Sequence, residues 1–298
     1  MPTSASSTPS SHRTANRTAA GSLIAEPLIG SPSPSELHVM TFNIRLDCGG
    51  TFPGEADYWP ERIPALQRLL RLELPTVLGV QEALLHQLEA IEDCLPGGYR
   101  RIGQGRDGGN EGEFSAIFYD SRRLTLLDSD QFWLSDTPRM PGSATWGNTT
   151  TRIMTRGRFR DRQSGRELQV INSHFDHLSE NARVKSAEAV LQLVRSTVPE
   201  IPTVLTADFN AAARSSSTHA AFVESGMFKD AWDAAQRRLT PAYGTFLDYK
   251  DPVEGGDRID WILASPEFQV LGAGVNPFTL EGRYPSDHAP VQALLRLS

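Results

Sequence analysis

The sequence predicts one α+β domain, a four-layer α/β/β/α sandwich of two packed mixed sheets flanked by helices. Short apolar segments of strand length recur from Leu37 onward, and a few longer segments with helical spacing lie between them. Sheets and helices each bury one apolar face, so many strands with few helices favour two sheets packed together with the helices outside. No linker-like segment follows Ser35, which indicates a single domain over residues 36–298.

The first part of this domain is expected to alternate strands with helices. Residues 37–44 and 77–82 are short, largely apolar segments that predict strands. Between them, residues 62–74 carry apolar side chains at helical spacing. Residues 84–94 predict a second helix, which ends before the helix-breaking residues that begin at Pro96.

The remaining part is expected to be richer in strands. Strands are predicted at residues 115–119, 124–134 (a pair broken at Asp128 and Ser129), 152–160, 167–174, 202–208, 258–264 and 288–297. The run Gln163-Ser164-Gly165 predicts a hairpin turn between two of them. Residues 182–198 place their apolar side chains on one stripe, which predicts a helix.

Residues 1–35 are rich in Ser, Thr, Pro and Ala and predict a disordered tail. Their apolar stretches are too short for the core of a signal peptide, and no segment of the chain approaches the length of a membrane span. We therefore expect a cytoplasmic protein, with secretion left open. A transit peptide is the alternative for this segment, because Arg13 and Arg17 lie within it.

The charge of the chain bears on its partners. The formal net charge is −7, from 29 Lys and Arg against 36 Asp and Glu. Proteins that bind long nucleic acids usually present a basic surface, because phosphate contacts dominate their affinity. An acidic chain therefore makes nucleic acid a possible but disfavoured partner and suits a metalloenzyme whose carboxylates hold a cation. We expect a monomer.

Asn43 and Glu82 each follow a predicted strand, where a rigid scaffold usually displays functional side chains. An Asn amide can ligate a hard cation or bind a phosphate oxygen, although Asn at a strand end is also common in turns. Glu82 precedes a predicted helix, so its carboxylate either stabilises the start of that helix or ligates Mg²⁺. The residues alone leave these readings open.

The run from His174 to His177 contains two His and one Asp within four residues. Strand alternation would place His174 and Asp176 on one face and His177 on the other. We expect His174 to hold a phosphate oxygen and Asp176 to orient a partner or contact the substrate. A zinc site is the competing reading, since His and Asp supply nitrogen and oxygen ligands, but no matching Cys or His cluster occurs elsewhere.

Asp208 and Asn210 lie two residues apart after an apolar strand, so an extended backbone would place both side chains on the same side. A carboxylate there can orient or deprotonate water, and the amide can hold a phosphoryl oxygen. The alternative is a turn rich in Asp and Asn, which favour strand ends.

Asp260 lies among apolar residues, where an unpaired charge would be costly, and therefore needs a partner. The obvious partner is His288, in the run Ser286-Asp287-His288. An Asp that accepts a hydrogen bond from imidazole fixes its tautomer and holds it ready for proton transfer.

Four arginines alternate along one predicted strand: Arg152, Arg156, Arg158 and Arg160. Arginines on one face could clamp a second phosphate, whereas a solvated polar face is the plainer interpretation for most of them. Because of its position at the start of the strand, we expect Arg152 to contact the substrate.

Taken in order, six short runs resemble the motif set of the endonuclease/exonuclease/phosphatase superfamily over Met40 to Val291. They are Thr41-Phe42-Asn43, Gln81-Glu82, His174-Phe175-Asp176, Asp208-Phe209-Asn210, Arg258-Ile259-Asp260 and Ser286-Asp287-His288. The run from Gln131 to Pro138 and its flanking sequence resemble a bacterial branch of uncertain substrate, closer to nocturnin-like and small-substrate phosphoesterases than to dedicated nucleases.

This resemblance implies a Mg²⁺ site at Asn43, Glu82 and Asp287, with Glu82 as the most direct ligand and Mn²⁺ as a possible substitute. It also implies roles for the reacting groups. Asp208 would orient or activate the attacking water, Asn210 would bind phosphoryl oxygens, and His174 would contact the scissile phosphate. His288 would act as a general base or stabilise the transition state.

The expected activity is hydrolysis of a phosphate mono- or diester of a small molecule, by direct attack of water. Nucleotides, sugar phosphates and lipid head groups all remain as substrates. One alternative is an endo- or exonuclease that acts on DNA or RNA. Another is an inactive scaffold that binds a phosphorylated ligand, and a glycosidase with paired carboxylates ranks last because it has no use for the Asn residues.

Overall fold

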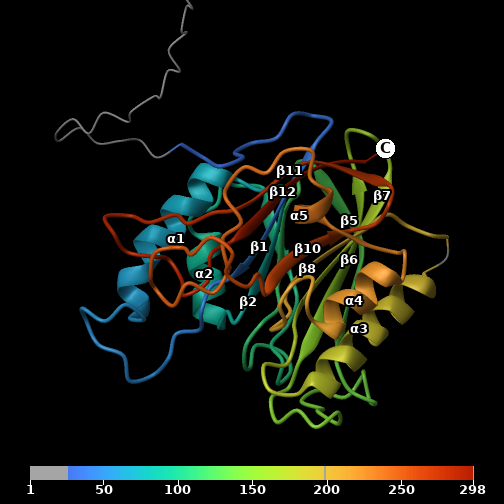
Figure 1. The fold of residues 1–298 in the computed structure, drawn as a ribbon, viewed down its shortest axis with the longest axis horizontal. Helices are drawn as coiled ribbons and strands as arrows, with labels where there is room; N and C mark the ends of the chain where they lie inside the picture. Colours follow the sequence, from blue (N-terminus) through green and yellow to red (C-terminus); the bar gives the residue numbers. More distant parts are fainter. Residues whose placement is uncertain (1–25, 198, 298) are drawn as a thin grey trace, which may run out of the picture.

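The computed structural model describes residues 26–197 and 199–297, and the described strands form two six-stranded sheets (Figure 1). In the first sheet the strand order is β11-β12-β1-β2-β4-β3. Its strands are β1 (Leu37–Asn43), β2 (Val77–Gln81), β3 (Tyr99–Ile102), β4 (Ile117–Asp120), β11 (Phe268–Val275) and β12 (Val291–Leu297). The sheet is mixed, because β1 runs parallel to β2 and antiparallel to β12.

The second sheet has the order β5-β6-β7-β8-β10-β9. Its strands are β5 (Leu124–Trp133), β6 (Ile153–Asp161), β7 (Glu167–His174), β8 (Thr203–Asp208), β9 (Lys229–Asp230) and β10 (Asp260–Ala264). This sheet is also mixed, because β8 runs parallel to β7 and antiparallel to β10.

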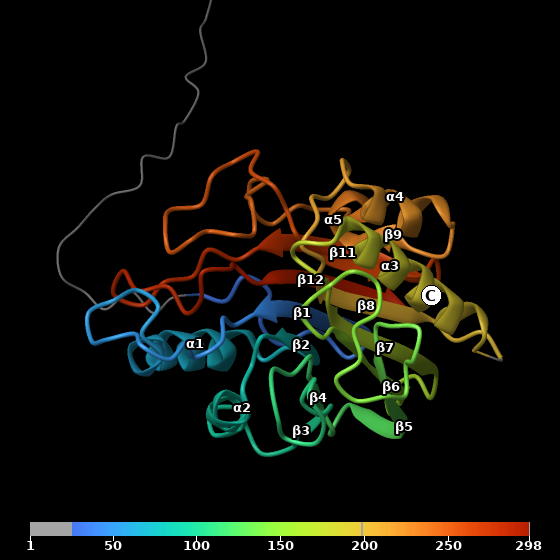
Figure 2. The same ribbon diagram turned by 90° about the horizontal axis from the view of Figure 1, so that it is seen from below.

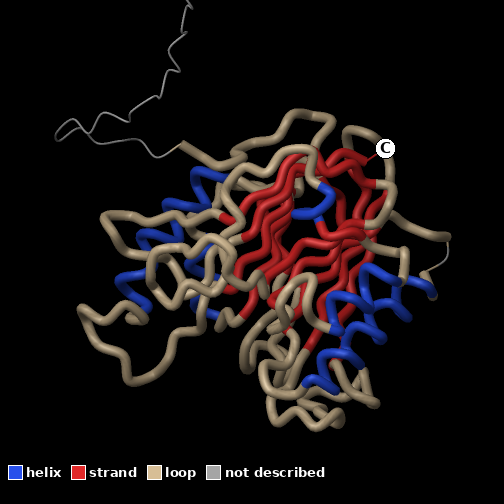
Figure 3. The backbone as a smooth tube through the Cα atoms, in the orientation of Figure 1, coloured by secondary structure: helices blue, strands red, loops and turns tan. Residues whose placement is uncertain are grey.

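Helices cover the outer face of each sheet (Figure 3). The first sheet carries α1 (Trp59–Glu73) and α2 (Leu85–Glu92), whereas the second carries α3 (Glu180–Arg195) and α4 (Ser217–Glu224). The short α5 (Ala231–Ala234) contacts β10 and β11. The two helix pairs lie on opposite sides of the strands in both perpendicular views (Figures 1 and 2). The predicted four-layer sandwich is therefore confirmed.

The alternation of side chains along the strands separates three apolar clusters. In β1, Val39 joins the core between the sheets, whereas Met40 packs with α1 and α2. In β8, Val204 lies between the sheets and Leu205 packs with α3 and α4. Burial on both faces of these strands explains their almost continuous apolar sequence.

Toward one end of the sandwich, the layer between the sheets becomes polar. Asn172 on β7 donates its amide to the carbonyl oxygens of Val80 and Ala116, at 2.9 Å each, and so joins the second sheet to the first. A Cβ atom on Gly79 would lie 2.2 Å from Thr206 Oγ1, so only glycine allows this close approach. The site residues lie just beyond this polar layer.

The predicted elements agree with the structure at most positions. The differences concern a predicted break, five elements that were not predicted, and the boundary of the predicted tail. The segment 124–134 forms one strand with a register shift between Leu126 and Asp128, where a bulge takes the place of the predicted break. Five described elements were not predicted: β3, α4, β9, α5 and β11.

The boundary of the predicted tail also differs from the structure. Residues 1–25 lie outside the described residues, but residues 26–35 lie against the domain. The buried carboxylate of Glu73 accepts the backbone N–H groups of Leu28, Ile29 and Gly30 at 2.6, 3.1 and 3.0 Å. The part of the chain that contacts the domain therefore begins before Glu36. Among residues 26–197 and 199–297, no helix has the length and apolar character to cross a membrane.

Candidate active site

A cleft of about 570 Å³ opens at the polar end of the two sheets and draws its walls from both. Seven of the ten predicted site residues line it, namely Glu82, Arg152, His174, Asp208, Asn210, Asp287 and His288. The other three lie behind this wall: Asn43, Asp176 and Asp260 are each at most 1% exposed. The structure thus gathers side chains that are up to 245 residues apart in sequence.

Asn43 ends β1 and joins the two halves of the cleft. Its Nδ2 donates to Glu82 Oε1 and to Asp208 Oδ2, at 2.9 Å each. Glu82 Oε2 accepts the backbone N–H of Leu46 at 3.2 Å, so the carboxylate faces the cleft rather than the start of α2. The backbone of Glu82 is left-handed, with φ 62°, a strained state that is typical of functional positions.

Asp287 lies beside Glu82, and Arg45 lies between the two carboxylates. Arg45 Nε is 3.7 Å from Asp287 Oδ2, and its Nη1 is 3.7 Å from Glu82 Oε2. Ser286 Oγ donates to the carbonyl oxygen of Asn43 at 2.7 Å, which fixes this loop to β1. Burial raises the pKa of Asp287, and the negative charge of Glu82 adds to the shift. A cation between these oxygens would relieve that repulsion.

His174, Asp208 and Asn210 form the opposite wall. Asn210, with φ 49°, donates its backbone N–H to Asp208 Oδ1 and its amide to His174 Nε2, at 2.9 Å each. The same amide donates to the carbonyl oxygen of Phe175 at 3.0 Å, which sets its orientation and leaves the His174 proton on Nδ1. Burial and the positive charge of Arg152 hold the pKa of His174 well below its usual value, so this ring is neutral.

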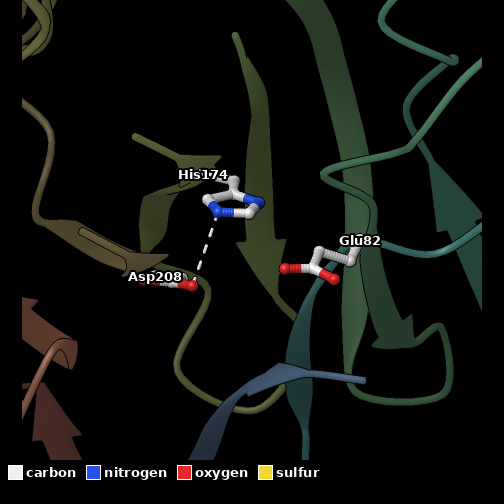
Figure 4. A group of neighbouring side chains, drawn as sticks. All are labelled: Glu82, His174 and Asp208. Atoms are coloured by element: carbon white, nitrogen blue, oxygen red, sulfur yellow. Dashed lines mark ion pairs between the residues drawn. The ribbon is translucent and has the colours of Figure 1, made fainter. Parts of the chain in front are cut away.

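The carboxylate of Glu82 points across the cleft toward His174 and Asp208 (Figure 4). One ligand atom from each of these three residues lies within 4.8 Å of the other two. His174 Nε2 and Asp208 Oδ2 are 3.4 Å apart. Two of these ligand atoms are carboxylate oxygens, which suit a hard cation such as Mg²⁺, and the third is a ring nitrogen of His174.

The predicted pairing of Asp260 with His288 is present. Asp260 Oδ2 accepts a hydrogen bond from His288 Nδ1 at 2.9 Å, and His288 Nε2 lies 3.9 Å from Asp208 Oδ2. Burial opposes the charge on His288, but Asp260 outweighs it and raises the pKa of His288 to about 10. Burial and the charge of Asp260 raise the pKa of Asp208 to about 7.

Asp176 and Arg152 differ from their predicted placement. Strand β7 ends at His174, so strand alternation does not extend to Asp176. Asp176 Oδ1 accepts the backbone N–H groups of Leu178 and Ser179, at 3.0 and 2.7 Å, and the residue does not line the cleft. This geometry supports a positioning role for Asp176 instead of substrate contact. Arg152 does line the cleft, and its Nη2 donates to His177 Nδ1 at 3.1 Å.

The other three arginines of the predicted strand match the interpretation as a solvated polar face. Arg156 pairs with Asp128, and both Arg158 and Arg160 pair with Glu167 on the neighbouring strand. The zinc reading also finds no support, because no cluster of metal-ligand type within the described residues includes His177 or Asp176.

The cleft is also lined by residues that the sequence reasoning missed, among them Arg45, Arg106 and Phe246. Arg45 lies two residues after Asn43, and a search for a cation beside the expected acidic site could have found it. Arg106 and Phe246 lie in irregular segments without a motif. Phe246 is 52% exposed, and its ring packs edge-on against His288 with centroids 5.2 Å apart.

The comparison with known families now bears on this geometry. Residues 40–288 match the model of the endonuclease/exonuclease/phosphatase family. The chain belongs to this family. Members of the endonuclease/exonuclease/phosphatase family hydrolyse phosphoesters, so the predicted family and the general class of reaction are confirmed. No curated protein matches the chain.

Solved structures of the endonuclease/exonuclease/phosphatase family support the assignment. A family protein from Bacteroides thetaiotaomicron is 33% identical, with 88% of this chain and 98% of that chain covered and a TM-score of 0.81. A mannosyl-6-phosphatase from the same species is 34% identical, with 87% and 99% covered and a TM-score of 0.80. The human nocturnin catalytic domain, crystallised with sulfate, is 18% identical, with 89% and 94% covered and a TM-score of 0.66, and shows the shared fold alone.

Proposed function

We propose that the protein is a Mg²⁺-dependent phosphoesterase that hydrolyses a small phosphorylated molecule by direct attack of water. The observation that carries this proposal is the meeting of Glu82, His174 and Asp208 in one cleft, beside the paired Asp260 and His288. The similarity to a mannosyl-6-phosphatase supports a small substrate and favours a sugar phosphate. A cytoplasmic monomer remains our prediction, which size-exclusion chromatography and cell fractionation would test.

The residues that would hold the metal are Asn43, Glu82 and Asp287. Their fit rests on the oxygen donors of the Glu82 and Asp287 carboxylates, which both lie 3.7 Å from Arg45, and on the negative charge of Glu82, which adds to burial in raising the pKa of Asp287. Asn43 presents its NH₂ group to Glu82, so ligation by this residue requires its amide to turn. When bound, Mg²⁺ would neutralise the charge that develops on the phosphoryl and leaving oxygens.

The protein side chains would carry the proton transfer and the positioning. As the water oxygen bonds to phosphorus and the bond to the leaving oxygen breaks, Asp208 accepts the proton of the water, which a pKa of about 7 permits. His288 is protonated at neutral pH, so it stabilises phosphoryl oxygens by hydrogen bonding rather than acting as a base. Asn210 and His174 hold the phosphoryl group in place.

The test uses purified protein with Mg²⁺ and a panel of sugar phosphates, nucleotides and phosphorylated head groups, with plasmid DNA as a nuclease control. EDTA should abolish hydrolysis, and Mg²⁺ or Mn²⁺ should restore it. Asp208→Ala and His288→Ala should each reduce turnover by at least about 10²–10³-fold while the protein stays folded.

Matched controls exist on the surface of the chain. Asp128 is paired with Arg156 on β5 and β6, and His86 is half exposed, so Asp128→Ala and His86→Ala should retain activity. Turnover near that of the wild type in Asp208→Ala or His288→Ala would contradict the proposal, as would activity untouched by chelation. Nicking of plasmid without hydrolysis of small esters would assign a nuclease instead.

A further inference from the structure

A small pocket adjoins the cleft and shares four of its lining residues, Arg106, Glu113, Arg152 and His174. Its free volume is about 10 Å³. A pocket of this size holds one water-sized group and leaves no room for an alkyl chain. Ser115 and Thr151 complete its polar wall.

Arg152 brings a buried guanidinium whose hydrogen-bond donors are only partly paired. The residue is 5% exposed, and its Nε has no hydrogen-bond partner among the described residues. The nearest carboxylate oxygen, Asp176 Oδ2, lies 3.7 Å from that Nε, beyond hydrogen-bond distance. Its one side-chain partner at hydrogen-bond distance is the ring of His177. A buried guanidinium in this state favours an anion beside it.

The other polar groups of the pocket differ in how far they are paired. Arg106 Nη2 pairs with Glu113 Oε1 at 2.8 Å, so these two residues neutralise each other. His174 is neutral, and its buried Nδ1 has no hydrogen-bond partner among the described residues. The pocket therefore presents two buried N–H donors without a partner among the described residues, Arg152 Nε and His174 Nδ1, and the ring of His174 also borders the catalytic group Asp208.

We propose that this pocket binds a non-bridging oxygen of a terminal phosphate and that the protein therefore prefers phosphate monoesters to diesters. The inference rests on the proposed function, because it places the scissile phosphate beside His174 and Asn210. A phosphate monoester has three non-bridging oxygens and a second negative charge, so it is the stronger acceptor for the two unpaired donors of the pocket. A diester has two such oxygens and one negative charge, and its third oxygen carries a carbon group, for which the pocket has no space.

A matched pair of substrates tests this inference. With Mg²⁺ present, 4-nitrophenyl phosphate and methyl 4-nitrophenyl phosphate release the same leaving group and differ by one methyl group. We expect the wild-type protein to have the higher kcat/KM on the monoester. Arg152→Met should lower kcat/KM on the monoester by about 10- to 100-fold, the loss of one charge-assisted contact, and lower kcat/KM on the diester by a smaller factor.

Arg158→Met is the control, because Arg158 lies in β6, which begins directly after Arg152, and pairs with Glu167 away from the cleft. It should change neither rate. A wild-type preference for the diester would overturn the inference, and so would an equal loss on both esters in Arg152→Met.

Calorimetric binding of methyl phosphate and dimethyl phosphate separates this inference from the proposed function. The wild-type protein should bind methyl phosphate at least about tenfold more tightly, and Arg152→Met should lose that difference. If methyl phosphate binds in this way but no ester is hydrolysed, the proposed function fails and the pocket stands. Equal binding of the two compounds by the wild-type protein would overturn the pocket assignment.

Discussion

The pairing of Asp260 with His288 makes a sharp prediction about pH. Asp260→Asn keeps the shape of the side chain and retains an oxygen that can accept the hydrogen bond from His288 Nδ1, now 2.9 Å long. It removes the negative charge that does most to raise the pKa of His288. The substitution therefore changes the protonation of the imidazole with little change in its position.

The size of the effect follows from the two pKa values. In the wild-type protein, with a pKa of about 10, His288 is almost fully protonated at pH 8. If its pKa falls to the ordinary value of about 6.5, the protonated fraction at pH 8 drops about 30-fold. The charges of Asp208 and Asp287 also raise the pKa of His288 and remain in the variant, so about 30-fold is an upper estimate.

The assay is kcat/KM between pH 6 and pH 9 at saturating Mg²⁺, for the wild-type protein and Asp260→Asn. We expect the variant to approach the wild type at pH 6 and to fall behind it as the pH rises. NMR titration of the His288 ring, assigned with His288→Gln, reads the pKa directly. If the activity of the variant rises with pH relative to the wild type, His288 acts as a base. If the ratio of the two kcat/KM values stays constant across pH, Asp260 does not control the protonation of His288.

Three further predictions concern stability. Gly79→Ala should lower the free energy of unfolding in urea by about 1–3 kcal/mol, because its Cβ would meet Thr206 Oγ1 at 2.2 Å, whereas Gly97→Ala, with nothing within 4 Å, should not. Asn172→Ala should lower the free energy of unfolding by about 2 kcal/mol or more, since it leaves two buried carbonyl groups without a donor. An unchanged free energy of unfolding would show that water replaces the amide. Burial lowers the pKa of His38 to about 4, so His38 binds fewer protons in the native state than in the unfolded chain. The free energy of unfolding should therefore fall as the pH drops from about 6.5 toward 4. The expected loss is about 2 kcal/mol between pH 7 and pH 5. His38→Asn should flatten that dependence, and an identical slope in the variant would assign it to other groups.

Much of the fold could be predicted because apolar periodicity is strong in its central elements. Helix α3 and the strands β7 and β8 follow their expected patterns closely, since burial on one or both faces dictates their residues. Strand β11 was missed because Gly272 and Gly274 interrupt its apolar pattern, although both lie in the ladder with β12. Helix α4 was missed because it has only eight residues and follows a run of serines that reads as a loop.

The site was easier to predict in its residues than in its contacts. Asn43, Glu82 and Asp208 could be found because each follows a buried strand, and the sheets then bring these strand ends together. The orientation of the Asn43 amide toward two carboxylates could not be predicted, because it depends on neighbours that are distant in sequence. Nor could the Arg106–Glu113 pair, whose partners lie in an irregular segment without periodicity.

The order of the strands has a consequence for synthesis of the protein on the ribosome. All strands of the second sheet come from one continuous stretch, Leu124 to Ala264, whereas β1 pairs with β12 and must wait for it. Residues 286–288, between β11 and β12, carry the last side chains of the cleft. A nascent chain can therefore form its second sheet early and still have no complete site. The enzyme becomes competent only when the end of the first sheet closes on its beginning, a contact of high sequence separation that is expected to form slowly.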